Sequence, residues 1–403
     1  MGMLGLVCAG ASCASAQTAP QTGSGDYPVA NDARVGGDAR QTRFVVDLSR
    51  KVDIHPFTLA DPYRVVIDLP QVTFQFPDKA GERGRGLVKA FRYGLVMAGG
   101  SRIVLDTTGP VRVDKAFVLD ASDSQPARLV LDLLPVSREA FLRAAAVDGR
   151  PAHPSPRPAE PPAATSGDQR PIIVVDPGHG GIDSGTGARD GGEAEKTMVL
   201  DFAVMLRDKL EKTGKYRVVM TRSDDTFVPL ADRVRLARSR NAELFISIHC
   251  DALARGDGEA QGATVYTLSD HATDAEAAKL ADAENRADVI SGVDLSAEPD
   301  DIAGILIDLA QRETKAFSLQ FAKRLVGELK TAARMHKNPL KSAGFRVLRA
   351  PDVPSVLIEL GYVSSRKDLK QMMSESWRTH AGDAIVKAVD GYFTTRMAGG
   401  TGR

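Results

Sequence analysis

The sequence has 403 residues, enough for two domains or one large one. Hydrophobic residues make up 43% of it, and 52 Lys and Arg balance 52 Asp and Glu, so the formal net charge is zero. This balance excludes the strongly basic composition typical of a dedicated nucleic-acid-binding protein, and we expect no nucleic-acid partner. After the N-terminus no run reaches the roughly 18 apolar residues that a membrane span needs, so none is expected. A monomer is the default expectation.

The N-terminal residues 1–16 are apolar and small, and they end in Ala14–Ala16, an A-x-A pattern that signal peptidases cleave. We therefore predict a signal peptide that directs the chain to the periplasm. Cleavage after Ala16 would remove two of the three cysteines and leave Cys250, so no internal disulfide is expected. Residues 17–40 are rich in Gly, Ala, Gln, Ser and Thr, which predicts a flexible leader.

Residues 41–136 contain short apolar runs that begin with Arg and end at or near Asp, with turn formers between them. The clearest runs are Arg43–Leu48, Arg64–Leu69, Arg102–Asp106 and Arg128–Leu133. Many short strands separated by turns predict an all-β sandwich, in which these Arg and Asp side chains face solvent or pair across strands. The segment resembles the AMIN domain, a small β-sandwich that precedes cell-wall amidases. The resemblance implies targeting to the division site, with peptidoglycan as one ligand that could mediate it.

Residues 137–170 are predicted to be a linker, because residues 151–162 are too rich in proline for a helix or a central strand. Residues 171–396 then alternate strand-like and helical segments, which predicts an α/β fold with a mostly parallel sheet flanked by helices, preceded by the sandwich. Strands are expected at Ile172–Val175, Tyr216–Met220, Leu244–Ile248, Ala263–Tyr266, Phe345–Leu348 and Val356–Glu359, and helices at Lys196–Leu210, Leu230–Arg240, Thr314–Leu329 and Glu375–Phe393.

Polar residues follow three of these strands, at the carboxyl ends where α/β sheets hold their sites. His179 lies in the glycine-rich segment Asp176–Asp183, directly after the first strand. His249 directly follows Leu244–Ile248, and Glu359 is the last residue of its own strand. Two imidazoles with one carboxylate can bind a catalytic Zn²⁺ and leave a fourth position for water. The sequence therefore predicts a zinc site at this edge.

Two carboxylates are needed, one as a ligand and one as a base. Glu359 suits the role of the carboxylate that activates water and later protonates the leaving nitrogen. The third ligand is Glu195 or Glu193, and Glu195 is favoured because the adjacent helix fixes its backbone. Any one of these residues alone could be an ordinary core histidine or carboxylate. Their joint occurrence at three strand ends favours a metal site.

The same half of the chain resembles the zinc-dependent N-acetylmuramoyl-L-alanine amidases of the Amidase_3 type. The matching stretches are Val175–Gly185, Glu195–Lys196, Met220–Arg222, Leu230–Arg235, Leu244–Ala252 and Val353–Glu359. By resemblance, His179, Glu195 and His249 are zinc ligands and Glu359 is the catalytic glutamate. The implied reaction is hydrolysis of the amide bond between muramic acid and L-alanine in peptidoglycan. The His179–Glu195 loop is one residue longer than the usual pattern, so the choice between Glu193 and Glu195 stays open.

Residues 270–313 interrupt the alternation of strands and helices. Residues 274–290 are rich in Ala, Asp and Glu, and Gly292 and Pro299 separate them from a further apolar helix. The segment Ala283–Val293 resembles the insertion of division-associated amidases, in which a helix covers the site, places a glutamate on the zinc and is displaced by an activator protein. Glu284 is our candidate for that glutamate. A solvated acidic helix is the alternative interpretation.

Two other functions fit the same residues. One is a zinc carboxypeptidase acting on stem peptides, which would release a terminal D-alanine instead of a whole peptide that begins with L-alanine. The other is a non-catalytic scaffold that binds peptidoglycan through its β domain. The presence of both histidines, Glu195 and Glu359 argues against the scaffold.

Overall fold

The computed structural model describes residues 27–147, 168–186, 194–251, 261–292 and 305–400, apart from residues 61, 78, 98–99 and 123–124. The predicted signal peptide, residues 1–16, lies outside this part of the chain, as does the proline-dense part of the predicted linker. Within the described residues, we find no helix with the length and apolar character that a membrane crossing requires.

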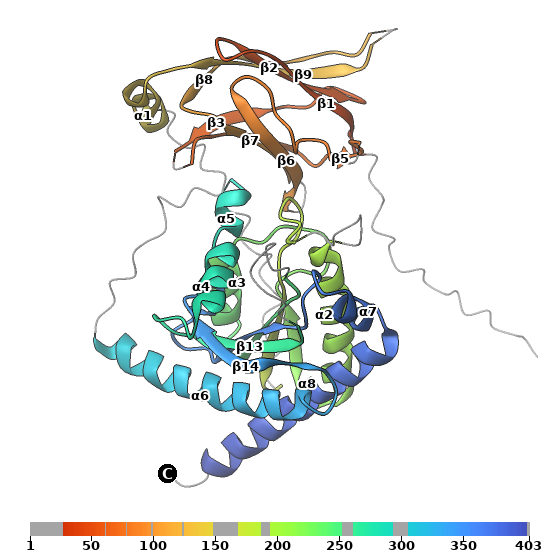
Figure 1. Ribbon diagram of the computed structural model, residues 1–403, viewed down its shortest axis with the longest axis vertical. Coiled ribbons are helices and arrows are strands. Elements are labelled where there is room, and N and C mark those ends of the chain that lie inside the picture. Colours follow the sequence, from red (N-terminus) through yellow and green to blue (C-terminus); the bar gives the residue numbers. More distant parts are fainter. Residues whose placement is uncertain are drawn as a thin grey trace, which may run out of the picture.

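The N-terminal half forms two mostly antiparallel sheets (Figure 1) that enclose one apolar core, so the predicted β-sandwich is confirmed. The five-stranded sheet has the order β5-β1-β2-β9-β8, and the four-stranded sheet has the order β3-β4-β7-β6. The strands are β1 (Val29–Gly37), β2 (Thr42–Leu48), β3 (His55–Leu59), β4 (Arg64–Pro70), β5 (Thr73–Phe74), β6 (Val88–Met97), β7 (Gly100–Thr107), β8 (Val111–Leu119) and β9 (Ala127–Pro135).

The repeated Arg and Asp residues form bidentate pairs across neighbouring strands. Arg43 on β2 donates to both oxygens of Asp132 on β9, with distances of 2.7 and 2.8 Å. Arg102 on β7 makes the same pair with Asp68 on β4, at 2.5 and 2.9 Å. The expectation of pairing across strands is therefore confirmed for Arg43 and Arg102, whereas Arg64 donates to backbone carbonyls.

Two predicted boundaries of the sandwich are wrong. The leader was expected to reach residue 40, but β1 occupies Val29–Gly37, because this polar segment is an outer strand that pairs with β2. The linker was expected to begin at residue 137, but helix α1 covers Arg138–Val147. Phe141 anchors this helix, since its ring is buried and packs edge-on against Tyr63, with ring centroids 5.1 Å apart.

The C-terminal half is a six-stranded sheet of order β11-β10-β12-β15-β13-β14, and only the β13–β15 pair is antiparallel. The mostly parallel α/β fold is thus confirmed. The strands are β10 (Ile172–Pro177), β11 (Arg217–Met220), β12 (Leu244–His249), β13 (Ala263–Leu268), β14 (Met335–Ala343) and β15 (Ser355–Glu359).

Helices cover both faces of this sheet (Figure 1), and successive strand residues alternate between the two apolar cores. Ile173 and Val175 pack with helices α2 (Glu195–Lys212), α6 (Ile305–Leu329) and α8 (Glu375–Gly400). Val174 and Phe245 pack on the opposite face, toward α3 (Leu230–Ser239) and α4 (Ala275–Glu284). Two short helices complete the domain: α5 (Ala287–Ile290) and α7 (Arg366–Met372).

The sequence misassigned the segment before β15. Phe345–Leu348 was predicted to be a strand, but Arg346–Leu348 form a 3₁₀ helix in which Phe345 and Leu348, three residues apart, enter the same core. The sixth strand of the sheet is β14, a half-buried edge strand beside β13. Its Lys, Asn and Pro residues interrupt any hydrophobic pattern, so the sequence did not predict it. The expected helix Thr314–Leu329 and the apolar helix expected shortly before it are one helix, α6.

We predict that Phe321→Ala lowers the free energy of unfolding by about 3–5 kcal/mol, because it empties a core position. Phe321 is fully buried between α6 and α8, with its ring centroid 5.4 Å from that of Tyr392. Leu319, two residues earlier on the same helix, is 39% exposed, and Leu319→Ala should cost less than about 0.5 kcal/mol. Urea unfolding of both variants checks this, and equal costs would contradict the described packing.

Candidate metal centre

The loop after β10 presents His179 in a strained backbone conformation. Its φ of 59° lies in the left-handed region, which residues other than glycine rarely adopt. Nδ1 of His179 lies 2.9 Å from the buried carboxylate of Asp183, which fixes the ring and places the hydrogen on Nδ1. The other ring nitrogen, Nε2, is buried and has no hydrogen-bond partner. It is therefore free to bind a cation.

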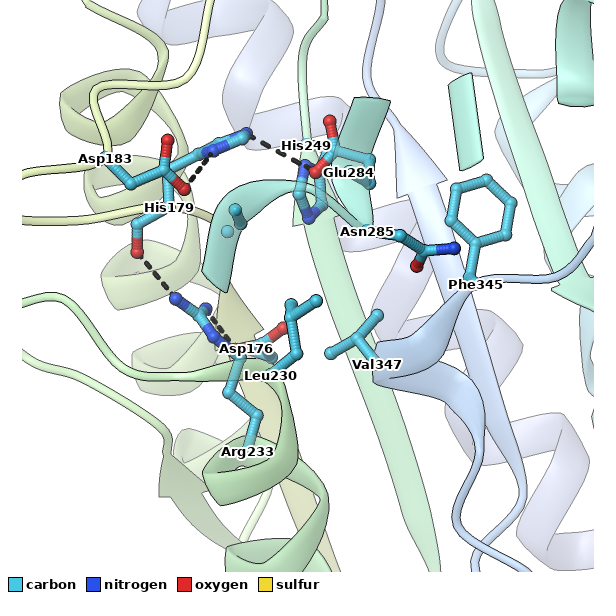
Figure 2. Close-up of a pocket in the computed structure, with 12 residues that line it drawn as sticks. Asp176, His179, Asp183, Leu230, Arg233, His249, Glu284, Asn285, Phe345 and Val347 are labelled. Atoms are coloured by element: carbon cyan, nitrogen blue, oxygen red, sulfur yellow. Dashed lines mark hydrogen bonds and ion pairs between the residues drawn. The ribbon is translucent and has the colours of Figure 1, made fainter. Parts of the chain in front are cut away.

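A buried ion pair supports this loop from below. Nη1 of Arg233 lies 2.7 Å from Oδ1 of Asp176, and the two side chains are 2% and 1% exposed. The same guanidinium donates to the backbone oxygens of Pro177 and His179, at 2.8 and 2.7 Å. Ser247 on β12 donates to the second oxygen of Asp176, at 2.7 Å. Arg233 thus holds the carbonyl of the strained residue directly, as Figure 2 shows.

The remaining predicted residues arrive from neighbouring elements. His249 ends β12 and lies in register with Glu359 at the end of β15. Glu195 begins α2, and its two oxygens accept hydrogen bonds from the backbone N–H groups of Cys250 (2.8 Å) and Thr186 (2.9 Å). A side chain at Gly178 would lie 2.4 Å from the His249 ring, so this loop residue must be glycine.

Three side chains converge on one point. One potential ligand atom from each of His179, Glu195 and His249 lies within 4.8 Å of the other two, and all three residues are buried. Oε1 of Glu195 lies 3.3 Å from Nε2 of His179 and 3.6 Å from Nδ1 of His249. Nδ1 of His249 is also buried without a hydrogen-bond partner. This arrangement could hold one metal ion.

Glu284 joins this cluster from the end of α4. Its Oε2 lies 3.2 Å from Nδ1 of His249 and 3.7 Å from Nε2 of His179. Figure 2 shows Glu284 next to both imidazole rings, with Asn285 beyond it on the same wall of the pocket. The side chain is buried, so the alternative of a solvated acidic face does not hold at this residue.

The site buries several carboxyl groups close together, and the protein alone does not stabilise all of them in their ionised form. Burial, together with repulsion from Asp251 and Glu195, raises the pKa of Glu359 well above its usual range. Burial also raises the pKa of Glu284 to about 7, against the attraction of His249 and His179. For Glu195, burial is outweighed by the two imidazoles, and its pKa is lowered well below the usual range. A bound cation would stabilise these buried carboxyl groups in their ionised form.

Glu359 keeps one oxygen available. Oε2 accepts a hydrogen bond from the backbone N–H of Asp251, at 2.9 Å, whereas Oε1 is buried and has no partner. The neighbouring Cys250 points into the apolar core, and burial together with the nearby carboxylates raises the pKa of its thiol well above the usual value. Cys250 is therefore a protonated core residue.

The structure brings together the five residues that the sequence singled out: His179, Glu195, His249, Glu284 and Glu359. Glu193, the alternative to Glu195, lies outside the described residues. Sequence reasoning missed the supporting roles of Asp183 and Arg233. Both lie inside the motifs that carried the resemblance, but a supporting role shows only when the partner atoms are placed.

Comparisons with known proteins show the family to which this chain belongs. The model of the Amidase_3 family of N-acetylmuramoyl-L-alanine amidases matches residues 173–391, and that of the AMIN domain matches residues 32–133. The N-acetylmuramoyl-L-alanine amidase AmiC of Escherichia coli O6:H1 is 32% identical over 378 residues, which cover 89% of this chain and 88% of that protein. The AmiC of Neisseria meningitidis serogroup B is 31% identical, with 91% and 90% covered.

Among solved structures, the N-acetylmuramoyl-L-alanine amidase from Clostridium difficile 630 is 25% identical and has a TM-score of 0.40, covering 56% of this chain and 98% of that one. The two family matches and the AmiC relatives extend over both domains. The chain therefore belongs to the N-acetylmuramoyl-L-alanine amidase family and is an enzyme of peptidoglycan hydrolysis, with an AMIN domain ahead of its amidase domain.

Proposed function

We propose that this enzyme hydrolyses the amide bond between N-acetylmuramic acid and the L-alanine of the stem peptide, with a zinc ion held by His179, Glu195 and His249. The observation that carries the proposal is the convergence of these three ligand atoms within 4.8 Å in a chain of the amidase family. Glu359 is the proposed catalytic glutamate, and peptidoglycan is the substrate.

The donor set suits zinc. Zinc–ligand bonds of roughly 2.0–2.2 Å in a tetrahedron separate the ligand atoms by roughly 3.3–3.6 Å. The distances from Glu195 Oε1 to the two ring nitrogens, 3.3 and 3.6 Å, fall in this range. Both nitrogens are buried without hydrogen bonds, a costly state that a bound cation would relieve. Asp183 would orient His179 as its supporting carboxylate.

When bound, zinc supplies the Lewis acid that polarises the carbonyl and makes a water acidic enough to attack. Glu359 would transfer the proton from the attacking water to the leaving nitrogen. Its unpartnered Oε1 can accept a proton from the water, whose oxygen adds to the lactyl carbonyl carbon. When the carbon–nitrogen bond breaks, Glu359 returns that proton to the nitrogen of L-alanine. Burial and the neighbouring carboxylates raise the pKa of Glu359, which favours its protonated form and so the step in which it donates to the leaving nitrogen.

We expect the Glu284→Ala chain, loaded with zinc, to release stem peptides with an L-alanine amino terminus from purified peptidoglycan. Release should stop with a chelator and return with added Zn²⁺, because the ligands remain in place. In that background, Glu359→Gln should lower the rate about 10²–10⁴-fold, because the amide cannot move the proton. Mass spectrometry of the released peptides measures both effects.

Three outcomes would contradict this assignment. Release of D-alanine alone would identify a carboxypeptidase. No release by folded, metal-loaded protein would favour a peptidoglycan-binding scaffold, and full activity of Glu359→Gln would remove that residue from the mechanism.

We expect Asp183→Asn to weaken zinc binding about 10–100-fold, since an amide orients and polarises His179 less than a carboxylate does. Competition with a chromogenic chelator measures this affinity directly. The matched control is Asp208→Asn, because Asp208 is a 61% exposed aspartate on α2 that pairs with Arg207. Equal affinities for wild type and Asp183→Asn would show that this contact has no role in metal binding.

We further propose that α4 and α5 form a lid that inhibits the enzyme, with Glu284 on the fourth metal position. Glu284 Oε2 stands 3.2 and 3.7 Å from the two ring nitrogens, spacings similar to those of Glu195. The lid is anchored at its start by the buried Lys341, whose Nζ lies 3.0 Å from Glu276. Between α4 and α5, the side chain of Asn285 donates to the carbonyl of Gly344, at 2.9 Å.

If this lid blocks the metal, the enzyme needs an activator. A fourth protein ligand leaves no position for water, so an activator protein would have to move the lid away. We propose that the enzyme works in the periplasm, in daughter-cell separation, and that its AMIN domain targets it to peptidoglycan. The AMIN match and the AmiC relatives support a location outside the cytoplasm.

We expect Glu284→Ala to raise the basal rate on peptidoglycan at least about tenfold, because it opens the fourth position without an activator. Asp282→Ala is the control, since Asp282 is an exposed carboxylate on the same helix. Dye release from labelled peptidoglycan, at equal zinc content, measures the rates. An unchanged rate for Glu284→Ala would rule out its role as a blocking ligand.

A further inference from the structure

The β-sandwich contacts the lid through two arginines of its four-stranded sheet. Nη1 of Arg64, on β4, donates to the carbonyl of Val289, at 2.5 Å. Nη1 of Arg102, on β7, donates to the carbonyls of Ser291 and Gly292, at 3.2 and 3.1 Å. These carbonyls lie at the carboxyl end of α5, where backbone oxygens need partners from outside the helix. In Figure 1, α5 lies between α4 and the sandwich.

Apolar side chains of the lid and of the four-stranded sheet also pack closely against each other. Ala287 of the lid packs in one buried cluster with Val66 and Val104, which lie on β4 and β7. A Cβ atom added at Gly292 would lie 3.0 Å from Val104 and 3.1 Å from Val66, tighter than ordinary van der Waals contact. The glycine therefore allows the lid backbone to approach the sheet.

The sandwich is also attached to the body of the catalytic domain, independently of the lid. The carbonyl of Leu95, on β6, accepts hydrogen bonds from the backbone N–H groups of Ile182 (3.3 Å) and Phe227 (3.4 Å). A Cβ atom at Gly181 would lie 1.9 Å from that carbonyl oxygen, so the loop that carries His179 fits closely against β6. The sandwich thus connects the fixed metal loop with the lid.

The side chain of Arg102 is held in place by a residue of the sandwich itself, Asp68. Its Nε and Nη2 are held by the two oxygens of Asp68, which leaves Nη1 directed at the lid carbonyls. A guanidinium already fixed by a bidentate pair loses little further freedom when it makes these contacts.

We propose that the four-stranded sheet of the β-sandwich is a docking surface for residues 287–292 of the same chain, and that this docking keeps the lid on the metal site. The inference rests on the proposed blocking role of Glu284. It gives the AMIN domain a second task besides targeting, because the lid cannot leave the site without breaking its contacts with Arg64 and Arg102.

The test compares the full-length chain with the double variant Arg64→Ala/Arg102→Ala. We expect a basal peptidoglycan-hydrolysing rate about tenfold higher, since several charge-assisted hydrogen bonds to the closed lid are lost. We also expect faster amide hydrogen exchange in residues 284–292. The milder variant Arg102→Lys keeps the charge but lacks the fork that holds Asp68 and the lid together, and it should shift both readouts in the same direction.

Arg43→Ala is the matched control. It removes a similar bidentate pair, with Asp132, from the other sheet, and within the described residues we find no hydrogen bond from Arg43 or Asp132 to residues 287–292. Neither the rate nor the exchange in residues 284–292 should change. This control separates loss of docking from a general loss of sandwich stability.

The outcomes distinguish docking from blocking. If Glu284→Ala is active but the double variant matches wild type in rate and exchange, docking is overturned while blocking stands. Faster exchange without faster hydrolysis, beside an active Glu284→Ala, would also overturn the claim that docking keeps the lid closed. If Glu284→Ala is inactive but the double variant exchanges faster, the docking surface stands and the blocking role fails.

Discussion

The buried ion pair between Asp176 and Arg233 is the constraint on which the rest of the site depends. Both side chains are almost fully buried, and the same guanidinium holds the carbonyl of His179 in its left-handed conformation. Removing one partner of such a pair leaves an uncompensated buried charge, which typically costs about 3–5 kcal/mol. The buried pair therefore fixes the conformation of this loop. The loop in turn sets the position of Nε2 of His179 relative to Glu195 and His249.

Charge balance connects this loop with the lid. Glu195, Glu284 and Glu359 are buried around two imidazoles, and the raised pKa values of Glu284 and Glu359 show how poorly the protein alone supports that much negative charge. A divalent cation would reverse this imbalance and bind the lid at the same time. The sandwich contacts both the outer end of the proposed lid and the loop that carries His179, so these hydrogen bonds join the two domains at the candidate site.

Local patterns in the sequence predicted the architecture and the histidines and glutamate that converge at one edge of the sheet, because the carboxyl ends of parallel strands meet there whatever the details of packing. What they missed depends on contacts distant in sequence. Arg233 and Asp176 are 57 residues apart, and no spacing rule links them. The polar strands β1 and β14 carry no hydrophobic alternation, since both lie at or near a sheet edge. Arg64 and Arg102 had been assigned to ordinary strand pairing, and their contact with the lid emerged only from the fold.

The central claim is that one zinc ion sits among the two histidines, Glu195 and Glu284. The most direct measurement is a crystal structure of the zinc-loaded, full-length protein, with anomalous diffraction recorded at the zinc absorption edge. We predict a single peak within about 2.0–2.2 Å of His179 Nε2, His249 Nδ1, Glu195 and Glu284. A peak bound by other residues would contradict the metal site, and a peak at this site with Glu284 turned away in the resting enzyme would contradict the closed lid.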